Sequence, residues 1–215
     1  MSYKYWQKTN LENSDTKNII EKYNAGFVLT RIKNEMHQIK SLRLDLKQFS
    51  LSSENRRILR KSEDLQIKVL ELPFDMKKYD WHIHAVGSEF YRTRFGAHIF
   101  SANKIKELIT DPLRSNFNRL VVLQDKKNNH SIGWCIGFEA ADLFHYSYPF
   151  YDLEYFQQGT GMTMLLKTAL WARDKNISQF YLGSIWDEKA KYKLQLQPAY
   201  FFDGESWQTT KNLKF

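Results

Sequence analysis

The sequence predicts an α+β fold: a mostly antiparallel central sheet flanked by helices, with a smaller N-terminal α/β part. Three observations lead to this expectation. Between residues 119 and 151, three apolar segments alternate with short polar turns, which is typical of an antiparallel meander. A glycine-bearing turn then opens a segment whose apolar residues recur at helical spacing. After it, patterns of strand, short helix and strand follow in order up to residue 202.

The N-terminal part carries weaker patterns. Residues 1–18 are polar with isolated aromatic side chains, and we expect an arm or a short helix there. A helix is predicted over residues 19–23, ending near Gly26, and a strand over residues 27–32. Residues 42–46 alternate apolar and charged side chains, as a half-buried strand does.

A charged helix follows, with Ser52 or Ser53 as its N-cap and Glu54 in the first turn, where the helix dipole favours an acid. At about 100° per residue, its basic side chains form one contiguous arc, namely Arg56, Arg57, Arg60 and Lys61. Ile58 and Leu59 lie opposite and are expected to anchor the helix to a core. No acid separates the cations within the arc, so they repel one another. We expect either a surface that binds a polyanion or an ordinary solvated face.

The segment Glu71-Leu-Pro-Phe-Asp75 interrupts these patterns and is the predicted boundary between residues 1–75 and residues 76–215. After it, Trp81-His-Ile-His84 is expected to form a strand with both histidines on one face. Such a pair could bind a metal ion, but no third ligand lies at a suitable spacing. Ordinary packing is therefore expected, and no metal site is predicted.

The rest of the chain shows regular elements. Ser101 is expected to cap a helix over residues 102–109. Strands are predicted over residues 119–124, 131–140, 143–151, 179–183 and 199–202, with a short helix over residues 187–194. The main helix is predicted over residues 160–175, because one face carries an apolar stripe of Met162, Leu165, Leu166, Ala169 and Leu170.

The main helix opens at Gly159-Thr-Gly161. A glycine-bearing turn at a helix N-terminus leaves several backbone N–H groups free beside the positive end of the helix dipole. This combination suits a phosphate or another anion. The alternative is a helix start whose glycines only permit close packing.

The composition is that of an ordinary globular protein, 42% hydrophobic and 26% charged, but the net charge is +8. This balance favours polyanionic partners, with nucleic acid first among them. The single cysteine, Cys135, excludes an intramolecular disulfide and any multi-cysteine metal site. The sequence shows neither the apolar segment of a signal peptide nor a window of ~18 apolar residues. A cytoplasmic protein with no membrane partner is expected.

The turn and its surroundings resemble the Gcn5-related N-acetyltransferase (GNAT) fold. The matching segment is Gln157-Gln-Gly-Thr-Gly161 followed by Leu165 and Leu166, after the predicted strand meander. In that family the corresponding loop holds the pyrophosphate of acetyl-CoA. Phe156 departs from the basic or polar residue that is often found at its position.

A longer series of segments is similar to arginyl-tRNA–protein transferases and their bacterial leucyl-transferring relatives. The segments keep the family's order and reach from residue ~27 to residue 207. They include Phe49-Ser-Leu-Ser-Ser-Glu-Asn-Arg-Arg-Ile-Leu-Arg-Lys61, Tyr148-Pro-Phe-Tyr-Asp152, Gly159-Thr160, Tyr181-Leu-Gly183, Lys189-Ala-Lys-Tyr-Lys193, Pro198, Gly204 and Trp207. Residues 29–39 lack the family's cysteine cluster, and Leu153 replaces its usual proline. A diverged member with another acceptor is therefore conceivable.

This resemblance implies transfer of an amino acid, arginyl or similar, from aminoacyl-tRNA to an amine such as a protein or peptide N-terminus. It makes residues 76–215 an acyltransferase-like domain and residues 1–75 a basic N-terminal part. No cofactor is expected, since aminoacyl-tRNA is the co-substrate. The implied catalytic residues are Asp152, Tyr151 and Tyr148, with Gly159, Thr160 and Gly161 as the turn that binds substrate and oxyanion. The implied tRNA-binding residues are Arg56, Arg57, Arg60, Lys61, Lys189, Tyr192 and Lys193.

Two other functions stay open at this point. The first is a CoA-dependent N-acetyltransferase, suggested by Gly159-Thr-Gly161, with acetyl-CoA as its donor; for either enzyme the expected acceptor is a protein, a peptide or a small amine. The second is a module that binds RNA without catalysis. The sequence does not predict the oligomeric state.

Overall fold

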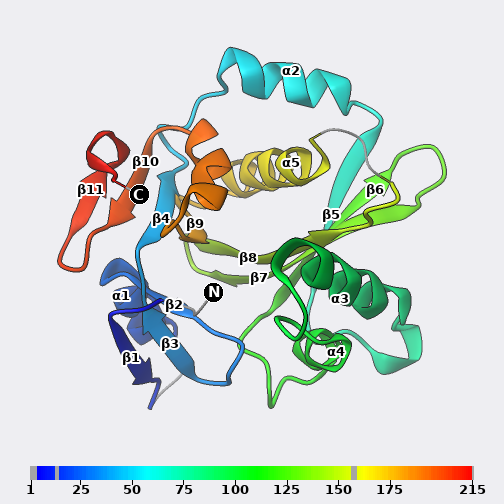
Figure 1. The fold of residues 1–215 in the computed structure, drawn as a ribbon, viewed down its shortest axis with the longest axis horizontal. Coiled ribbons are helices and arrows are strands. Elements are labelled where there is room, and N and C mark those ends of the chain that lie inside the picture. Colours follow the sequence, from blue (N-terminus) through cyan, green and yellow to red (C-terminus); the bar gives the residue numbers. More distant parts are fainter. Residues whose placement is uncertain (1–3, 13–14, 156–158, 215) are drawn as a thin grey trace.

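The protein is built from two sheets with helices packed around them (Figure 1). The structure, a computed structural model, describes residues 4–12, 15–155 and 159–214. Over these ranges no helix is long and apolar enough to cross a membrane. The large sheet has eight strands and the small sheet has three. The predicted α+β class, with a mostly antiparallel sheet flanked by helices, is confirmed.

The large sheet has the strand order β11-β10-β4-β9-β8-β7-β6-β5. Its strands are β4 (Ser41–Asp45), β5 (Leu65–Glu71), β6 (Arg119–Asp125), β7 (Ser131–Ala140), β8 (Leu143–Tyr151), β9 (Gln179–Ser184), β10 (Ala199–Phe202) and β11 (Trp207–Thr209). Its neighbouring strands are antiparallel except β8 and β9, which run parallel. The predicted meander of β6, β7 and β8 is confirmed, whereas β5 and β11 were not predicted.

The small sheet has the antiparallel order β1-β3-β2, from strands β1 (Gln7–Asn10), β2 (Phe27–Leu29) and β3 (Glu35–Gln38). Helix α1 (Thr16–Asn24) precedes it. The strand predicted over residues 27–32 was too long, because β2 ends at Leu29 and a turn follows. The sequence did not predict β3, because its Glu-Met-His-Gln pattern reads as polar although all four residues are buried.

Helices cover both faces of the large sheet. A hydrophobic core lies on each face of the sheet, and alternate residues of β6 point into one or the other. Leu120 and Val122 face the core that includes α3 (His82–Phe95) and α4 (Ala102–Thr110). Val121 and Leu123 face the other core, which is built around α5 (Thr160–Asp174). The small sheet and α1 pack on the α3 side. Three short 3₁₀ helices complete the chain, namely η1 (Met76–Lys78), η2 (Glu188–Gln195) and η3 (Thr210–Asn212).

Helix α2 (Ser53–Lys61) packs on α5, as the predicted anchors require. Ser52 caps it, and the side chain of Asn55 bonds back to the N–H of Ser52, which completes a capping box. Ile58 and Leu59 pack against the α5 core, which confirms their predicted role.

The segment around Trp81-His84 was predicted wrongly. It forms the start of α3, where the N–H of His82 bonds to a carboxylate oxygen of Asp80 at 2.9 Å. Two residues apart on a helix lie about 200° around the axis, so His82 and His84 point to different sides. His84 instead lies 2.9 Å from the hydroxyl of Tyr79 through its Nδ1. Ile83, Gly87, Phe90 and Tyr91 form the buried stripe that the strand prediction overlooked.

The predicted division at residue 75 stays a prediction. Strands β4 and β5 come before it and pair in the same sheet as β6 to β11, which come after it. The large sheet therefore includes strands from both sides of the predicted boundary.

Candidate functional site

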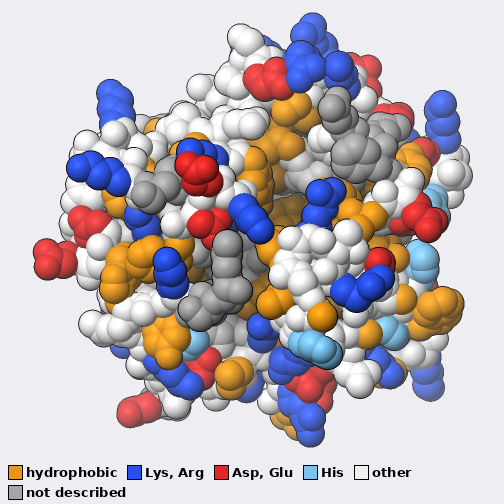
Figure 2. Space-filling view, viewed as in Figure 1, with side chains coloured by type: hydrophobic (Ala, Val, Ile, Leu, Met, Phe, Trp, Pro, Cys, Tyr) orange, Lys and Arg blue, Asp and Glu red, His pale blue; other side chains and the backbone are white. Residues whose placement is uncertain are grey.

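A cleft opens in the large sheet where its two parallel strands separate. The pairing of β8 with β9 runs through Leu143–Gln179 and Phe144–Phe180 and ends at His145–Tyr181. Beyond this point β8 continues to Tyr151, and a cavity of about 800 Å³ lies against its free edge. Figure 2 shows a hollow on this face with hydrophobic side chains in its depth and basic side chains at its rim. The cleft exposes backbone hydrogen-bonding groups in a concave, largely apolar space, which suits an extended ligand.

A β-bulge lies in the wall of this cleft. Tyr146 pairs with Gly137 of β7, but Tyr148 pairs with the adjacent Ile136, so Ser147 is the extra residue. Ser147 lines the cavity. Bulges bend a strand and redirect its groups, and they recur next to active sites.

The N-terminus of α5 closes one end of the cavity. Gly159 has φ of +101°, a left-handed conformation that favours glycine, and it provides no side-chain cap. Gly161 lies against the ring of Tyr151, where a Cβ atom would come within 3.1 Å of Cε1. Gly159, Thr160 and Gly161 all line the cavity. The first turn of α5 and the positive end of its helix dipole therefore face a space that can hold an anion. Phe156, Gln157 and Gln158 lie outside the described residues.

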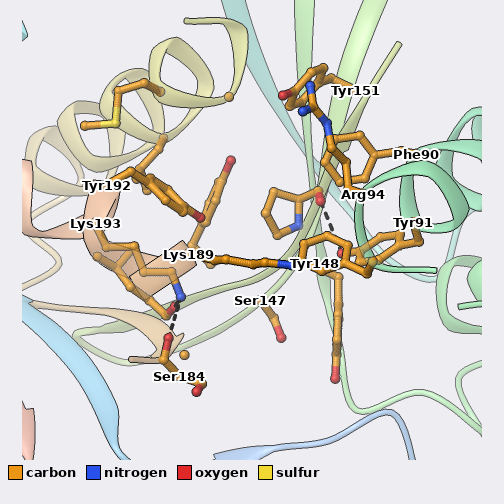
Figure 3. A pocket seen from close by; sticks show the side chains of 18 of the residues that line it. Phe90, Tyr91, Arg94, Ser147, Tyr148, Tyr151, Ser184, Lys189, Tyr192 and Lys193 are labelled. Carbon is orange, nitrogen blue, oxygen red and sulfur yellow. Dashed lines mark hydrogen bonds between the residues drawn. The ribbon is translucent and has the colours of Figure 1, made fainter. Parts of the chain in front are cut away.

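Two further walls come from α3 and η2 (Figure 3). Helix α3 contributes Phe90, Tyr91, Arg94 and Phe95, and η2 contributes Lys189, Tyr192 and Lys193. The hydroxyl of Tyr91 donates to the carbonyl oxygen of Pro149 at 3.1 Å and fixes α3 against β8. Among the described residues that line the cavity there is no aspartate or glutamate. The cavity therefore carries a positive charge without an acid to neutralise it.

Lys193 lies inside this cavity. Its Nζ donates hydrogen bonds to the carbonyl oxygens of Leu182 and Ser184, both at 2.7 Å. Burial lowers the pKa of Lys193 to about 8. The side chain thus fixes the end of β9 and places its ammonium group in the cleft. The sequence suggested that Lys193 contacts tRNA phosphates at the surface, but the structure places it in the cavity.

His145 lies at the base of the cleft, and the sequence reasoning did not select it. It is the last residue of β8 that pairs with β9, and it lines the cavity. Its Nδ1 lies 2.9 Å from the hydroxyl of Tyr23, a buried residue of α1. Burial, together with the charge of Lys193, lowers the pKa of His145 to about 3. The only signal in the sequence was a histidine in the middle of an otherwise aromatic and apolar strand.

The structure brings the predicted tyrosines to the cavity but leaves Asp152 outside its lining. Tyr148 and Tyr151 both line it, and burial raises the pKa of Tyr148 to about 12. Asp152 follows the last residue of β8, where its Oδ1 accepts a hydrogen bond from the N–H of Glu154 at 2.8 Å. Its catalytic role stays a prediction from the resemblance.

The cationic arc of α2 also lies outside the cavity lining. Arg57 is bonded to Glu54 through two nitrogens, so an acid does neutralise part of the arc, contrary to the expectation from the sequence. Figure 1 shows α2 and α5 running in opposite directions, which puts the C-terminal end of α2 and the N-terminal end of α5 at the same end of the pair. Arg60 and Lys61 are in the last turn of α2, and within the described ranges neither forms an ion pair.

Residues 50–194 match the family described as acetyltransferase (GNAT) domain. The chain belongs to this family. The match spans the α2 helix, the meander, the glycine turn and the cleft between β8 and β9. The protein is therefore an acyltransferase of GNAT type. The family match is not specific to arginyl-tRNA–protein transferases, and no curated protein matches the sequence.

Solved structures share the fold at low identity. A conserved protein of unknown function from Bacteroides thetaiotaomicron is 12% identical with a TM-score of 0.51, over 80% of this chain and 58% of that one. FemX is 10% identical with a TM-score of 0.49, over 79% and 58%. L-PGS from Bacillus licheniformis is 11% identical with a TM-score of 0.48, over 78% and 51%. The chain thus spans about half the length of L-PGS, and these likenesses concern the fold alone.

Proposed function

We propose that this GNAT domain transfers an amino acid from aminoacyl-tRNA to an amine. The observation that carries the proposal is the extent of the positive surface. Cationic groups line the cleft on two walls, and the basic end of α2 lies at the same end as the N-terminus of α5 (Figure 1). A coenzyme fills a cleft, whereas a tRNA also needs phosphate contacts on the surface beyond it. The net charge of +8 supports the same class of partner.

The chemistry requires little from the protein. The lone pair of the acceptor amine attacks the carbonyl carbon of the aminoacyl ester, so a C–N bond forms and the carbonyl electrons move to oxygen. The C–O bond to the ribose then breaks, the carbonyl re-forms, and the proton lost by the amine balances the proton gained by the ribose oxygen. Orientation of the amine and stabilisation of the oxyanion are the main contributions of such a site.

The roles of the predicted residues follow from this reaction. Gly159, Thr160 and Gly161 would bind a phosphate or a backbone segment of the donor through their N–H groups. Tyr148 and Tyr151 would contact the terminal nucleotide. Arg60 and Lys61, with Lys189 and Tyr192 on η2, would contact phosphates and the tRNA end, while Arg56 and Arg57 contribute less because they bond to Leu51 and Glu54.

A donor panel tests the proposal. Separately charged tRNAs carrying radiolabelled amino acids would be incubated with the protein and a set of peptides with different N-terminal residues. Transfer from one charged tRNA, together with tRNA binding that weakens steeply with salt, is the expected result. The proposal is wrong if no charged tRNA supports transfer and none is retained at low salt. Retention without transfer would instead identify a module that only binds RNA.

An acyl-CoA-dependent N-acetyltransferase is the second candidate. The family match and the left-handed turn at Gly159, which places the N-terminus of α5 at the cavity, favour it. The cleft between β8 and β9 would then hold the arm of the coenzyme. Calorimetric titration with acetyl-CoA separates the two functions, because binding in the micromolar range supports this candidate and the absence of binding removes it.

A further inference from the structure

His145 occupies an unusual position in the cleft. Its side chain is only 2% exposed, yet the residue lines the cavity at the point where β8 and β9 separate. Three groups lie around the His145 ring. They are the hydroxyl of Tyr23, the residue Tyr181, which pairs with His145 between β8 and β9, and the ammonium group of Lys193. A ring in this place has one side against the fold and the other toward the ligand space.

Tyr23 determines which nitrogen of His145 carries the proton. The Tyr23 oxygen accepts the backbone N–H of Leu29 at 3.4 Å, and within the described ranges Nδ1 of His145, at 2.9 Å, is the one acceptor for the Tyr23 hydroxyl proton, so we assign that proton to the bond with Nδ1. Nδ1 is then an acceptor, so in a neutral imidazole the proton is on Nε2. The ring is neutral because burial and the charge of Lys193 both oppose its protonation.

Nε2 faces the free space of the cleft. A Cβ atom built on Gly183 would lie 3.8 Å from Nε2, and Gly183, with φ of +66°, leaves that position empty. Across the part of the chain that the structure describes, no hydrogen bond to Nε2 is found. The N–H at Nε2 is therefore directed at the cavity that His145 lines, where an acceptor atom of a ligand can reach it.

The position of His145 in the cleft indicates which part of the ligand it contacts. Phosphates of the donor suit the N-terminus of α5, which lies beside Tyr151 at the far end of β8. From Tyr151 back to His145 the strand runs over six residues, or roughly 20 Å at ~3.3 Å per residue. The end of the donor opposite to its phosphates is the acyl group, so the acyl group reaches the base of the cleft.

We propose that Nε2–H of His145 donates a hydrogen bond to the carbonyl oxygen of the donor's acyl group, and that Tyr23 is the positioning residue that fixes this tautomer. The inference rests on the proposed acyl transfer. As the amine nitrogen bonds to the carbonyl carbon, negative charge develops on that oxygen, and the bond from Nε2–H strengthens. His145 neither gains nor loses a proton. The charge returns to the carbonyl as the bond to the leaving oxygen or sulfur breaks.

Two matched variants test the role of Nε2. The amide of asparagine reaches about as far as Nδ1, and that of glutamine about as far as Nε2. His145→Asn keeps a partner for Tyr23 but removes the donor in the cleft, so kcat should fall about 100-fold with the KM of the donor changed less than about threefold. His145→Gln restores a donor at that place and should stay within about tenfold of the wild type. Equal losses in both variants, or an unchanged kcat in His145→Asn, would overturn the inference.

A measurement on the unmodified protein covers the case in which the variants do not fold. Nitrogen-15 NMR of histidine-labelled protein should show His145 as the Nε2–H tautomer, with no titration between about pH 5 and pH 8. Tyr23→Phe should mix the two tautomers and lower kcat about tenfold while the thermal unfolding remains cooperative. An Nδ1–H tautomer in the wild type would reject the inference.

The proposed function and the role of His145 can be disproved separately. Acetyl-CoA and the set of charged tRNAs serve as the donors in these assays. If the wild type transfers from none of them, the proposed function and this inference are both wrong. If the wild type is active and His145→Asn is equally active, only the inference is wrong.

Discussion

The small sheet and the base of the cleft both bury polar side chains, but they use them differently. In the small sheet, the carboxylate of Glu35 accepts hydrogen bonds from Lys8 and Thr30 and lies 3.0 Å from Nε2 of His37. Lys8 belongs to β1 and Glu35 to the neighbouring β3, so the bond between them connects the two strands. At the base of the cleft, His145 bonds to the fold through one nitrogen and turns the other toward the cavity. A carboxylate that accepts hydrogen bonds from neighbouring segments stabilises a fold, whereas a ring nitrogen that faces a cavity is available to a ligand.

The largest expected effect beyond His145 comes from Lys193→Met. This change removes the buried cation and both bonds to the end of β9, so kcat/KM should fall about 100-fold. In the wild type the KM for the anionic donor should rise as the pH passes about 8, where Lys193 loses its proton, and the variant should lack this rise. Steady-state kinetics between pH 6.5 and 9.5 measure both. Lys191→Met on the same helix is the control, because Lys191 is exposed and paired with Glu188. A loss of the same size in the control would remove the distinction between buried and exposed cations.

A smaller effect is expected on the outer surface. The double change Arg60→Glu and Lys61→Glu should weaken tRNA binding about tenfold and lower the slope of log affinity against log salt, because two phosphate contacts are lost. Turnover with acetyl-CoA, if it occurs, should not change. Filter binding at several salt concentrations measures the slope, with Lys68→Glu on the exposed side of β5 as the matched control. Equal weakening by both variants would indicate a general charge effect instead of a tRNA contact.

Glu35→Gln tests the other half of the comparison. The variant should lose about 2 kcal/mol of unfolding free energy with activity within about twofold of the wild type, because Glu35 stabilises the small sheet and lies outside the cavity lining. Although burial opposes ionisation, the bond from Lys8 and the neighbouring His37 and Thr30 hold the pKa of Glu35 below its ordinary value.

The sign of the pH dependence follows from this lowered pKa. The stabilisation by Glu35 is complete above the unfolded pKa of about 4.3, and it is lost as the pH falls through the lower pKa of the folded state. Urea unfolding at pH 7 and near pH 3.5 should therefore show a difference between wild type and variant that shrinks at the lower pH. A difference that grows on acidification would contradict this account of Glu35.

Asp152→Asn is expected to have the smallest effect, under about tenfold in kcat. Asp152 is outside the described lining of the cavity, and an asparagine oxygen can still accept the hydrogen bond from Glu154. Rates of single turnover for the two proteins would measure it. A loss of 100-fold or more would instead support the catalytic role that the resemblance implied, with Asp152 acting on the amine.

The sequence alone determined the features that depend on near neighbours. The helix of residues 160–175, the cap at Ser52, the anchors Ile58 and Leu59 and the meander were all predicted correctly, because 3.6-residue and two-residue periods act within short segments. The start of this helix at Gly159-Thr-Gly161 was also predicted, and Gly159 adopts there a left-handed conformation that glycine tolerates without strain. Strand β3 was missed because its polar side chains are buried by partners on other strands, and β1 was missed because its polar, mostly exposed residues show no alternation of apolar side chains.

Only the tertiary structure decided how the site is built. Tyr23 and His145 lie 122 residues apart, and their contact depends on α1 packing near the start of β8. The cavity exists because two parallel strands separate after His145, which is a property of the sheet and not of either strand. Asp152 and Tyr151 are adjacent in sequence, yet Tyr151 lines the cavity and Asp152 does not. Local sequence fixes periodicity and caps, whereas the direction of a side chain relative to a distant strand is set by packing alone.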